Sequence, residues 1–392
     1  MNDLSIYCPS NLLYNQENMS RYEPGGFHPI CLGDTFKEGR YKIYHKLGWG
    51  GFSTVWLAWD GVLEMWVSIK VKSADNTENN RELGALRVLQ EKGALYHIVR
   101  QLDDFVHHGP NGCHQCLVFE LLGPSVDTIA NDYSESGDQL DPKIILKITT
   151  QMLEAISSIH KVGYTHGDIS GSNIGFTCPR LAYLPQDDLF EVLGIPEFEA
   201  LARVDGQPLH PGVPKQLVKK ANWKNWIDED EEDIRLIDFG EAFVQGSKPD
   251  SLAQPADLRA PETIFTDRFD HRLDLWRAGI TIYSSLFGSR PFQHWGGPDK
   301  LVRQMINFVE ELPAEWQPQW ELMQITAGQM GEQATTTTPT QSKLDQKFHD
   351  NVRDPALQRL LPVIRGLTRF RPSDRISAAE ALAMIAQGED QN

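Results

Sequence analysis

The sequence predicts an α+β fold in which a strand-rich first part is followed by a helical second part. Between residues 41 and 120, short runs of strand-forming residues are separated by turn residues. After Gly123, apolar residues recur at the spacing of amphipathic helices. A chain of 392 residues with 40% apolar side chains is long enough to bury a sizeable core. Two such parts leave a cleft between them, which is a usual place for a ligand.

The composition narrows the classes of partner. The 37 basic and 54 acidic residues give a net charge of −17, so we expect a basic partner and no direct nucleic-acid partner. No stretch approaches 18 consecutive apolar residues and the N-terminus lacks a secretory pattern, so we expect no membrane span or signal. Five cysteines in so long a chain make no disulfide framework, which favours the cytoplasm or the nucleus. We expect a monomer.

The first part is expected to be mostly strands. Residues 1–40 are polar and rich in turn residues, and they predict an extended N-terminal segment that is not a domain. A helix is expected near residues 79–90, where leucines fall on one stripe. Strands are expected at residues 41–47, 54–59, 66–71, 101–107 and 116–119.

The second part is expected to be helical. Asp141 and Pro142 are a good N-cap and first-turn pair for a helix that runs to about Ile159. Residues 273–287 are apolar on nearly all sides, as in a buried helix, and residues 376–386 predict a short closing helix. Two insertions are expected, one at 177–233 and one at 318–350, the second with a mobile loop around Thr335–Thr338. Residues 387–392 form a tail.

A glycine-rich turn between the first two predicted strands is a candidate phosphate-binding loop. Its glycines allow backbone N–H groups to approach phosphate oxygens closely, although a flexible hairpin would use the same residues. A strand and not a helix follows the turn, which argues against a dinucleotide-binding fold. The turn consists of Leu47, Gly48, Trp49, Gly50, Gly51, Phe52, Ser53, Thr54 and Val55.

Charged residues follow this turn at places where phosphate chemistry uses them. Lys70 lies in the next apolar strand, and Glu82 on the following helix either neutralises it or is an ordinary surface residue. Asp168 and Asn173, five residues apart on one loop, can supply a base and a metal ligand. Asp238, in Asp-Phe-Gly after a predicted strand at 234–237, offers a second oxygen ligand for Mg²⁺.

The order of these motifs resembles that of the eukaryotic protein-kinase family over residues 41–386. Ala260-Pro261-Glu262, Asp274-Leu275-Trp276 and Arg375 complete the pattern. The resemblance implies a bilobal fold, with an N-lobe at 41–120 and a C-lobe at 123–386, and phosphoryl transfer that depends on ATP and Mg²⁺.

A narrower resemblance points to the SR-protein kinase family. It rests on Tyr22-Glu23-Pro24-Gly25-Gly26-Phe27-His28-Pro29-Ile30, on Gly33-Asp34 and Arg40-Tyr41, on the turn from Leu47 to Leu57, and on the long insertion before Asp238. That family phosphorylates serines in Arg/Ser-rich splicing factors, which implies basic protein substrates, a role in mRNA splicing, and residence in cytoplasm and nucleus. The net charge of −17 suits a cationic substrate.

The resemblance assigns roles to single residues. Lys70, held by Glu82, would orient the α- and β-phosphates, and Asp168 would accept the proton of the substrate hydroxyl. Asn173 and Asp238 would hold Mg²⁺. The remaining roles fall to Phe119 as gatekeeper, to the backbone of Glu120 and Leu122 as adenine partners, to Glu262 and Arg375 as a buried ion pair, and to Asp274 as the anchor of the catalytic loop.

Three positions depart from the family pattern. Gly167 replaces an arginine that usually reads a phosphate on the activation segment, so we expect activity without such phosphorylation. Ser68 replaces an alanine, a change of little expected consequence. Ser170 replaces a lysine that contacts the γ-phosphate, and Ser172 does not restore the charge. Losing such a contact costs about 10²- to 10³-fold in rate.

The change at Ser170 leaves several alternatives open. Activity is reduced, another cation takes the place of the lysine, or the chain is a catalytically impaired scaffold. A fourth alternative is a small-molecule phosphotransferase, because aminoglycoside and choline phosphotransferases have a similar loop without the lysine. Those enzymes lack the Ala-Pro-Glu segment found at 260–262, which ranks this alternative lower.

Other polar features predict structure more than chemistry. Cys113-x-x-Cys116 has no second pair at ligand spacing, so we expect free cysteines and no zinc site. We expect a structural hydrogen bond for His166. The acidic run at 228–233 is expected to be a solvated stretch, with attraction of Arg/Ser substrates as the alternative.

Overall fold

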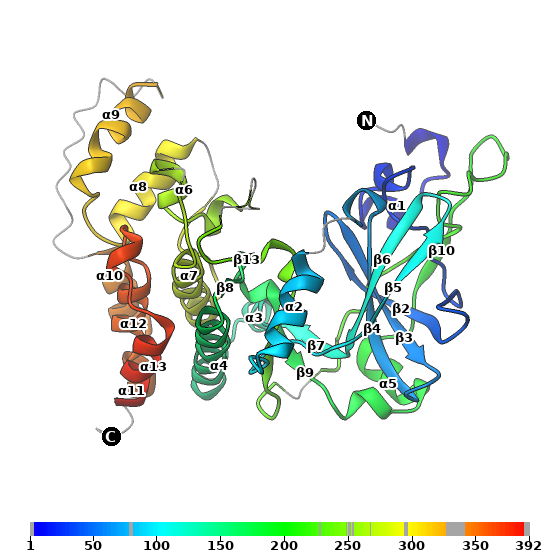
Figure 1. Ribbon diagram of the computed structural model, residues 1–392, viewed down its shortest axis with the longest axis horizontal. Helices are drawn as coiled ribbons and strands as arrows, with labels where there is room; N and C mark the ends of the chain where they lie inside the picture. The colour runs from blue at the N-terminus through cyan, green and yellow to red at the C-terminus, as the bar shows by residue number, and fades with distance from the viewer. Residues whose placement is uncertain are drawn as a thin grey trace. The chain divides into compact units, whose positions relative to one another are not determined.

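The computed structural model confirms the α+β prediction, with strands dominating the N-terminal part and helices the C-terminal part (Figure 1). It describes residues 4–77, 81–226, 229–247, 249, 252, 255–266, 268–293, 297–326 and 342–387. The chain divides into two compact units. Unit 1 comprises Met1–Leu83, Val99–Pro124 and Phe176–Glu232, and unit 2 comprises Gly84–Ile98, Ser125–Gly175 and Asp233–Asn392. Within the described ranges, no helix is long and apolar enough to cross a bilayer.

Unit 1 is built on an antiparallel sheet with the strand order β1-β2-β3-β4-β6-β5 (Figure 1). All five strands expected between residues 41 and 120 are present; four of them are two residues longer than expected, and the last, at 112–120, is five residues longer. β-branched and aromatic side chains such as Ile43, Trp56 and Val118 pack together in its core. The strands are β1 (Thr35–Phe36), β2 (Tyr41–Trp49), β3 (Ser53–Asp60), β4 (Met65–Lys72), β5 (Gln101–Gly109) and β6 (Gly112–Glu120).

The N-terminal segment, which was expected to be extended, carries short helical turns: η1 (Leu4–Ile6), α1 (Asn11–Tyr14) and η2 (Met19–Arg21). The segment expected to be an insertion, 177–233, carries η5 (Leu181–Tyr183), α5 (Gln186–Leu193) and the hairpin of β10 (Phe198–Ala200) with β11 (Gln216–Val218). Side chains from both segments form one apolar cluster, which includes Leu13, Phe27, Leu201 and Leu217. Both segments are therefore integral parts of unit 1.

A buried ion pair attaches the N-terminal segment to the sheet. The Lys46 ammonium on β2 donates to the Glu17 carboxylate, and the two side chains are 1% and 2% exposed. Glu17 also accepts a hydrogen bond from the Tyr22 hydroxyl. A buried charge is tolerated only when it is paired, so these contacts fix residues 17–22 against β2.

Unit 2 is organised around α4 (Pro142–Lys161) and α7 (Leu273–Phe287). The Asp141 carboxylate accepts from the Lys143 N–H at 2.8 Å, so α4 begins where the sequence predicts. Helix α7 is buried along most of its length and packs against α4 and α12 (Leu360–Leu367), while α13 (Ala378–Gln387) packs against α4 (Figure 1). Helix α13 begins two residues later than expected, because Ser377 and Glu380 form a reciprocal capping box.

The division between the units falls within α2 (Arg81–Glu91) and β9 (Ile174–Thr177) and at the end of β7 (Leu122–Ser125).

Shorter elements connect the helices of unit 2. Unit 2 also contains α3 (Val126–Ser136), β8 (Tyr164–Thr165), η4 (Gly171–Asn173), β12 (Ile234–Leu236), η6 (Phe239–Glu241), β13 (Phe243–Val244), η7 (Ala256–Leu258), α6 (Glu262–Phe265), α8 (Pro298–Phe308), η8 (Ala314–Trp316) and α11 (Pro355–Gln358).

The second expected insertion contains α9 (Gln317–Thr326) and α10 (Lys343–Asn351). The loop predicted around Thr335–Thr338 lies outside the described residues, as do residues 388–392 of the predicted tail and residues 78–80 before α2.

Candidate active site

The glycine-rich turn connects β2 to β3 in unit 1. Trp49 pairs with Thr54, and the Gly50 N–H donates to the Ser53 carbonyl at 2.8 Å, so the turn is a tight hairpin. A Cβ atom placed on Gly48, Gly50 or Gly51 would meet no described atom within 4 Å. The backbone of the turn is therefore not covered by described side chains at these three positions.

Lys70 and Glu82 form an ion pair in unit 1. Strand β4 carries Lys70, and its Nζ lies 2.9 Å from both Glu82 carboxylate oxygens. The side chains are 11% and 2% exposed, so Glu82 is not an ordinary surface residue. This pairing holds a positive charge in a fixed place beside the sheet that carries the glycine-rich turn.

The residues expected to contact adenine lie at the end of β6. Phe119 pairs with Ser68 of β4, and the Ser68 hydroxyl donates to the Glu120 carbonyl at 3.3 Å. Ser68 therefore has a structural consequence that the sequence did not predict. Leu122 follows as the first residue of β7.

Asp274 of α7 anchors the loop at 166–173 in unit 2. Its carboxylate accepts from the His166 and Gly167 N–H groups at 2.8 and 2.9 Å, and it lies 3.0 Å from His160 Nε2. Burial by itself opposes ionisation, but these partners outweigh it and hold the pKa of Asp274 below its usual value. The carboxylate is thus an ionised acceptor that fixes the backbone of the loop.

Asp168 and Asn173 are in contact. The Asn173 amide nitrogen donates to the Asp168 carbonyl and to Asp168 Oδ2, both at 2.8 Å. This orientation directs the amide nitrogen to Asp168 and leaves the amide oxygen, Asn173 Oδ1, as the atom that can bind a metal. The sequence placed these two residues on one loop, and the structure joins their side chains.

Asp238 is positioned next to this loop. The Ile237 N–H donates to the Asn173 carbonyl at 3.0 Å, which brings the two predicted metal ligands to neighbouring backbone segments. Asp238 has a left-handed φ of +61°, and its carboxylate accepts from the Gly240 N–H. His166 donates from Nε2 to the Ile237 carbonyl and accepts at Nδ1 from the Asp168 N–H, the structural role expected for it.

The residues present fit a magnesium ion. A carboxylate and an amide oxygen are hard ligands, and Mg²⁺ in phosphotransfer sites takes one or two protein ligands together with substrate phosphates and water. In the part of the chain that is described, no three His, Cys, Asp or Glu side chains converge on a common metal site. Asn173 Oδ1 and the Asp238 carboxylate are two oxygen ligands of the kind that such a site uses.

Comparison with known proteins identifies the family. Residues 218–385 match the protein kinase domain family. Serine/threonine-protein kinase SRPK of Physarum polycephalum is 36% identical over 326 residues, which are 76% of this chain and 73% of that protein. The chain belongs to the SR-protein kinase family. The predicted family resemblance is thereby confirmed.

Other members align over shorter stretches. Protein kinase dsk1 of Schizosaccharomyces pombe is 37% identical over 168 residues, which are 41% of this chain and 30% of that protein. SRSF protein kinase 3 of Homo sapiens is 36% identical over 177 residues, 43% of this chain and 30% of that protein. The aligned stretch is thus about a third of each relative. A crystal structure of a kinase domain matches with a TM-score of 0.60 at 20% identity, over 91% of this chain and 97% of that one, which confirms the kinase-domain fold.

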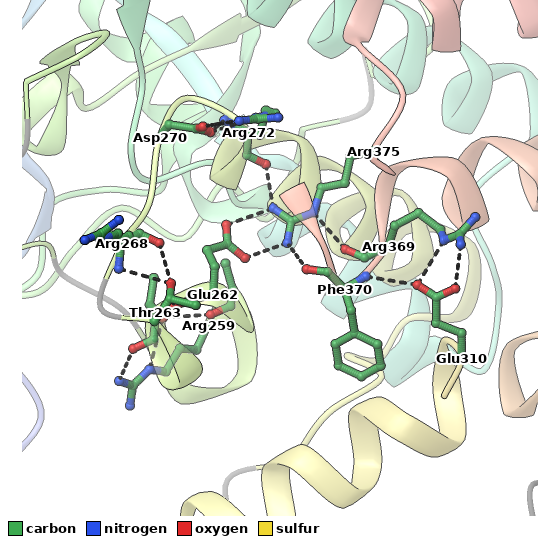
Figure 2. Close-up of polar contacts among 12 residues, drawn as sticks. Arg259, Glu262, Thr263, Arg268, Asp270, Arg272, Glu310, Arg369, Phe370 and Arg375 are labelled. Carbon is green, nitrogen blue, oxygen red and sulfur yellow. Dashed lines mark hydrogen bonds and ion pairs between the residues drawn. The ribbon is translucent and has the colours of Figure 1, made fainter. Parts of the chain in front are cut away.

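Glu262 and Arg375, expected from the SR-protein kinase resemblance to pair, do so in unit 2 (Figure 2). The two guanidinium contacts are 2.8 and 2.5 Å long, and the side chains are 1% and 0% exposed. Arg375 also donates to the carbonyls of Arg369, Phe370 and Arg272. The pair joins the start of α6 to the segment that precedes α13.

Gly167, a departure from the kinase pattern, has a structural explanation. Its φ is +82°, and a Cβ atom would lie 2.4 Å from the Glu241 carbonyl oxygen. An arginine there would be strained and would clash with backbone. The left-handed backbone conformation at this position therefore favours glycine by itself, independently of any phosphate on the activation segment.

Arg277 is a site residue that the sequence did not reveal. It lies in α7, and its guanidinium Nη1 donates to Asp168 Oδ1. The available signal was a basic side chain within a mostly apolar helix, three residues after Asp274. Ser170, where a lysine is usual, is buried and uncharged. The positive charge next to Asp168 comes instead from Arg277 on α7.

The structure also shows the cysteines and the acidic run, for which the sequence predicted no chemistry. None of the five cysteines, all of which the structure describes, forms a disulfide, and Cys113 Sγ lies 3.1 Å from His108 Nδ1. In the acidic run, Glu229 and Glu232 are buried, and Glu232 accepts from the Thr177 hydroxyl, so the expectation of a wholly solvated stretch is wrong. Both residues belong to unit 1. Asp228 lies outside the described residues.

Proposed function

We propose that the chain is an ATP- and Mg²⁺-dependent serine/threonine protein kinase that phosphorylates serines in Arg/Ser-rich proteins. The observation that carries the proposal is the contact of Asp168 with Asn173 beside Asp238 in unit 2. Unit 1 supplies the second requirement, a glycine-rich turn and a lysine held by a buried glutamate. Enzymes that transfer phosphoryl groups use these two groups of residues together.

The chemistry of the proposed step follows from the side chains. The seryl oxygen forms a bond to the γ-phosphorus while the bond from that phosphorus to the β,γ-bridging oxygen breaks, and ADP leaves. Asp168 accepts the hydroxyl proton, and Lys70 orients the phosphates. Mg²⁺, which Asn173 Oδ1 and the Asp238 carboxylate would hold, supplies neutralisation of phosphate charge when bound.

The substrate class is supported by charge and by the relatives. A protein of net charge −17 attracts cationic segments at long range. The family member from Homo sapiens is named for SRSF proteins. We extend that substrate class to this chain as part of the proposal, with cytoplasm and nucleus as the compartments in which it would act.

Transfer of label from γ-labelled ATP to an Arg/Ser peptide tests the proposal. The unchanged chain should incorporate at least about 10²-fold more label than Asp168→Asn or Lys70→Met, because each variant removes one group on which the reaction depends. A peptide with alanine in place of arginine should react with a lower kcat/KM, and the difference should shrink as salt is added.

The outcomes separate the alternatives. Equal, background-level incorporation by the unchanged chain and Asp168→Asn would indicate a catalytically impaired scaffold. Label transferred to an aminoglycoside or choline, and not to the peptide, would indicate a small-molecule phosphotransferase. Equal kcat/KM for both peptides at low salt would retain the kinase and reject the Arg/Ser preference.

A further inference from the structure

Arg277 is a fully buried arginine on a helix that is otherwise mostly apolar. Its side chain is 0% exposed and donates to Asp168 Oδ1, whose side chain is 25% exposed. A guanidinium stays charged at any pH at which a protein is folded, and burying it is costly unless an opposite charge is near. Arginine at this position therefore places a permanent positive charge on the Asp168 carboxylate.

The position of Arg277 on α7 links it to the anchor of the same loop. Asp274 and Arg277 are three residues apart, so both side chains lie on one face of the helix. Asp274 holds the backbone of residues 166 and 167, and Arg277 holds the side chain of the residue that follows them. Helix α7 is buried and packs against α4 and α12, so it is a rigid support for these contacts.

The Asp168 carboxylate is held at both oxygens. Oδ1 accepts from Arg277 and Oδ2 accepts from the Asn173 amide at 2.8 Å. Each carboxylate oxygen offers two lone-pair directions, so both oxygens keep a site for a hydroxyl donor. The two contacts fix the rotation of the carboxylate without using all of its acceptor capacity.

We propose that Arg277 is a positioning residue that replaces, from helix α7, the fixed positive charge that protein kinases usually supply from a lysine at position 170. Ser170 is uncharged and buried in this chain, whereas the Arg277 guanidinium pairs with the Asp168 carboxylate itself. Arg277 acts through Asp168 by holding its carboxylate toward the seryl hydroxyl. The inference rests on the proposed kinase function.

A double-mutant cycle with Arg277→Met and Ser170→Lys tests this inference in the full-length chain. Arg277→Met should lower kcat by about 10²-fold, the effect of a misplaced catalytic group, and leave KM for ATP within about threefold. Ser170→Lys should raise the kcat of Arg277→Met at least tenfold more than it raises the kcat of the unchanged chain. In the double variant the arginine is absent, so the introduced lysine has to supply the positive charge, whereas in the unchanged background Arg277 already supplies it.

Two controls accompany the cycle. Arg365→Met makes the same chemical change on α12, where the side chain is 52% exposed, and should keep kcat within about twofold. Thermal melting of every variant reports folding. If Arg277→Met does not fold, Arg277→Lys takes its place, because it keeps a charge but loses the planar fork that orients the carboxylate.

Three results would overturn the inference while leaving the proposed function intact. Ser170→Lys could give equal gains with and without Arg277. Arg277→Met could lose activity that Ser170→Lys does not restore in a folded protein, which indicates a purely structural role. Arg277→Met could equal or exceed the unchanged chain, which indicates a restraining contact. Label transfer by the unchanged chain no greater than that by Asp168→Asn would instead overturn the proposed function and the inference with it.

Discussion

Glu262→Gln removes the charge from a buried ion pair while keeping the shape of the side chain. The Glu262 carboxylate lies 2.8 and 2.5 Å from the two terminal nitrogens of Arg375, and neither side chain is more than 1% exposed (Figure 2). Arg375 also donates to three backbone carbonyls. The guanidinium therefore remains buried and charged after the substitution, without its counter-charge.

The size of the effect follows from these contacts. Removing one partner of a buried pair costs about 3–5 kcal/mol. The three carbonyls and the glutamine amide oxygen still accept from Arg375, so we expect the lower end, about 3 kcal/mol. At about 2–4 °C for each kcal/mol in a domain of 150–250 residues, Tm should fall by about 6–12 °C.

Thermal unfolding of the full chain, followed by circular dichroism, measures this change. Glu315→Gln is the matched control, because Glu315 pairs with Arg371 at 2.7 Å while both side chains are about half exposed, at 51% and 45%. An exposed pair contributes little to stability, so the control should leave Tm nearly unchanged. Equal shifts in Tm for Glu262→Gln and Glu315→Gln would refute the reasoning.

Three further predictions concern the loop, the histidines and phosphorylation. Gly167→Ala should lower the free energy of unfolding by at least about 1 kcal/mol more than Gly163→Ala, measured by chemical denaturation. Both glycines have φ near +82°, but only a Cβ at Gly167 meets backbone, at 2.4 Å from the Glu241 carbonyl oxygen, so equal losses would contradict the prediction. Burial and two neighbouring histidines lower the pKa of His28 to about 3, whereas an unfolded histidine titrates near 6.5. The unfolded state therefore binds a proton that the folded state does not, and stability falls as the pH is lowered from about 6.5 to 3. His28→Phe should make this dependence shallower by up to about 1.4 kcal/mol per pH unit, and an unchanged slope would count against it. Kinase activity should survive phosphatase treatment, because Gly167 cannot bind an activation-segment phosphate, and a large drop in kcat would reject this view.

The elements that local sequence determines were predictable. The start of α4 depends on Asp141 and the residues next to it, and the strands of unit 1 depend on short-range patterns. The Asp168–Asn173 contact also follows from a motif whose two members lie on one loop. These parts of the site required no knowledge of distant contacts.

Contacts between distant segments were not predictable. Arg277 lies 109 positions after Asp168, and nothing in the sequence near either residue marks them as partners. The sequence predicts an extended N-terminal segment, but the structure has short helices there. These helices are stabilised by apolar contacts with residues near 201 and 217 and by the buried Glu17–Lys46 pair, which local sequence does not reveal. Tertiary packing of this kind overrides local propensity.

Calorimetric titration of the full chain with ATP in the presence of Mg²⁺ tests the central claim most directly. We expect saturable binding of one nucleotide per chain that weakens when Mg²⁺ is withheld and when Lys70 is replaced by methionine. Heat that never rises above that of dilution, with the chain shown to be folded by circular dichroism, would contradict it.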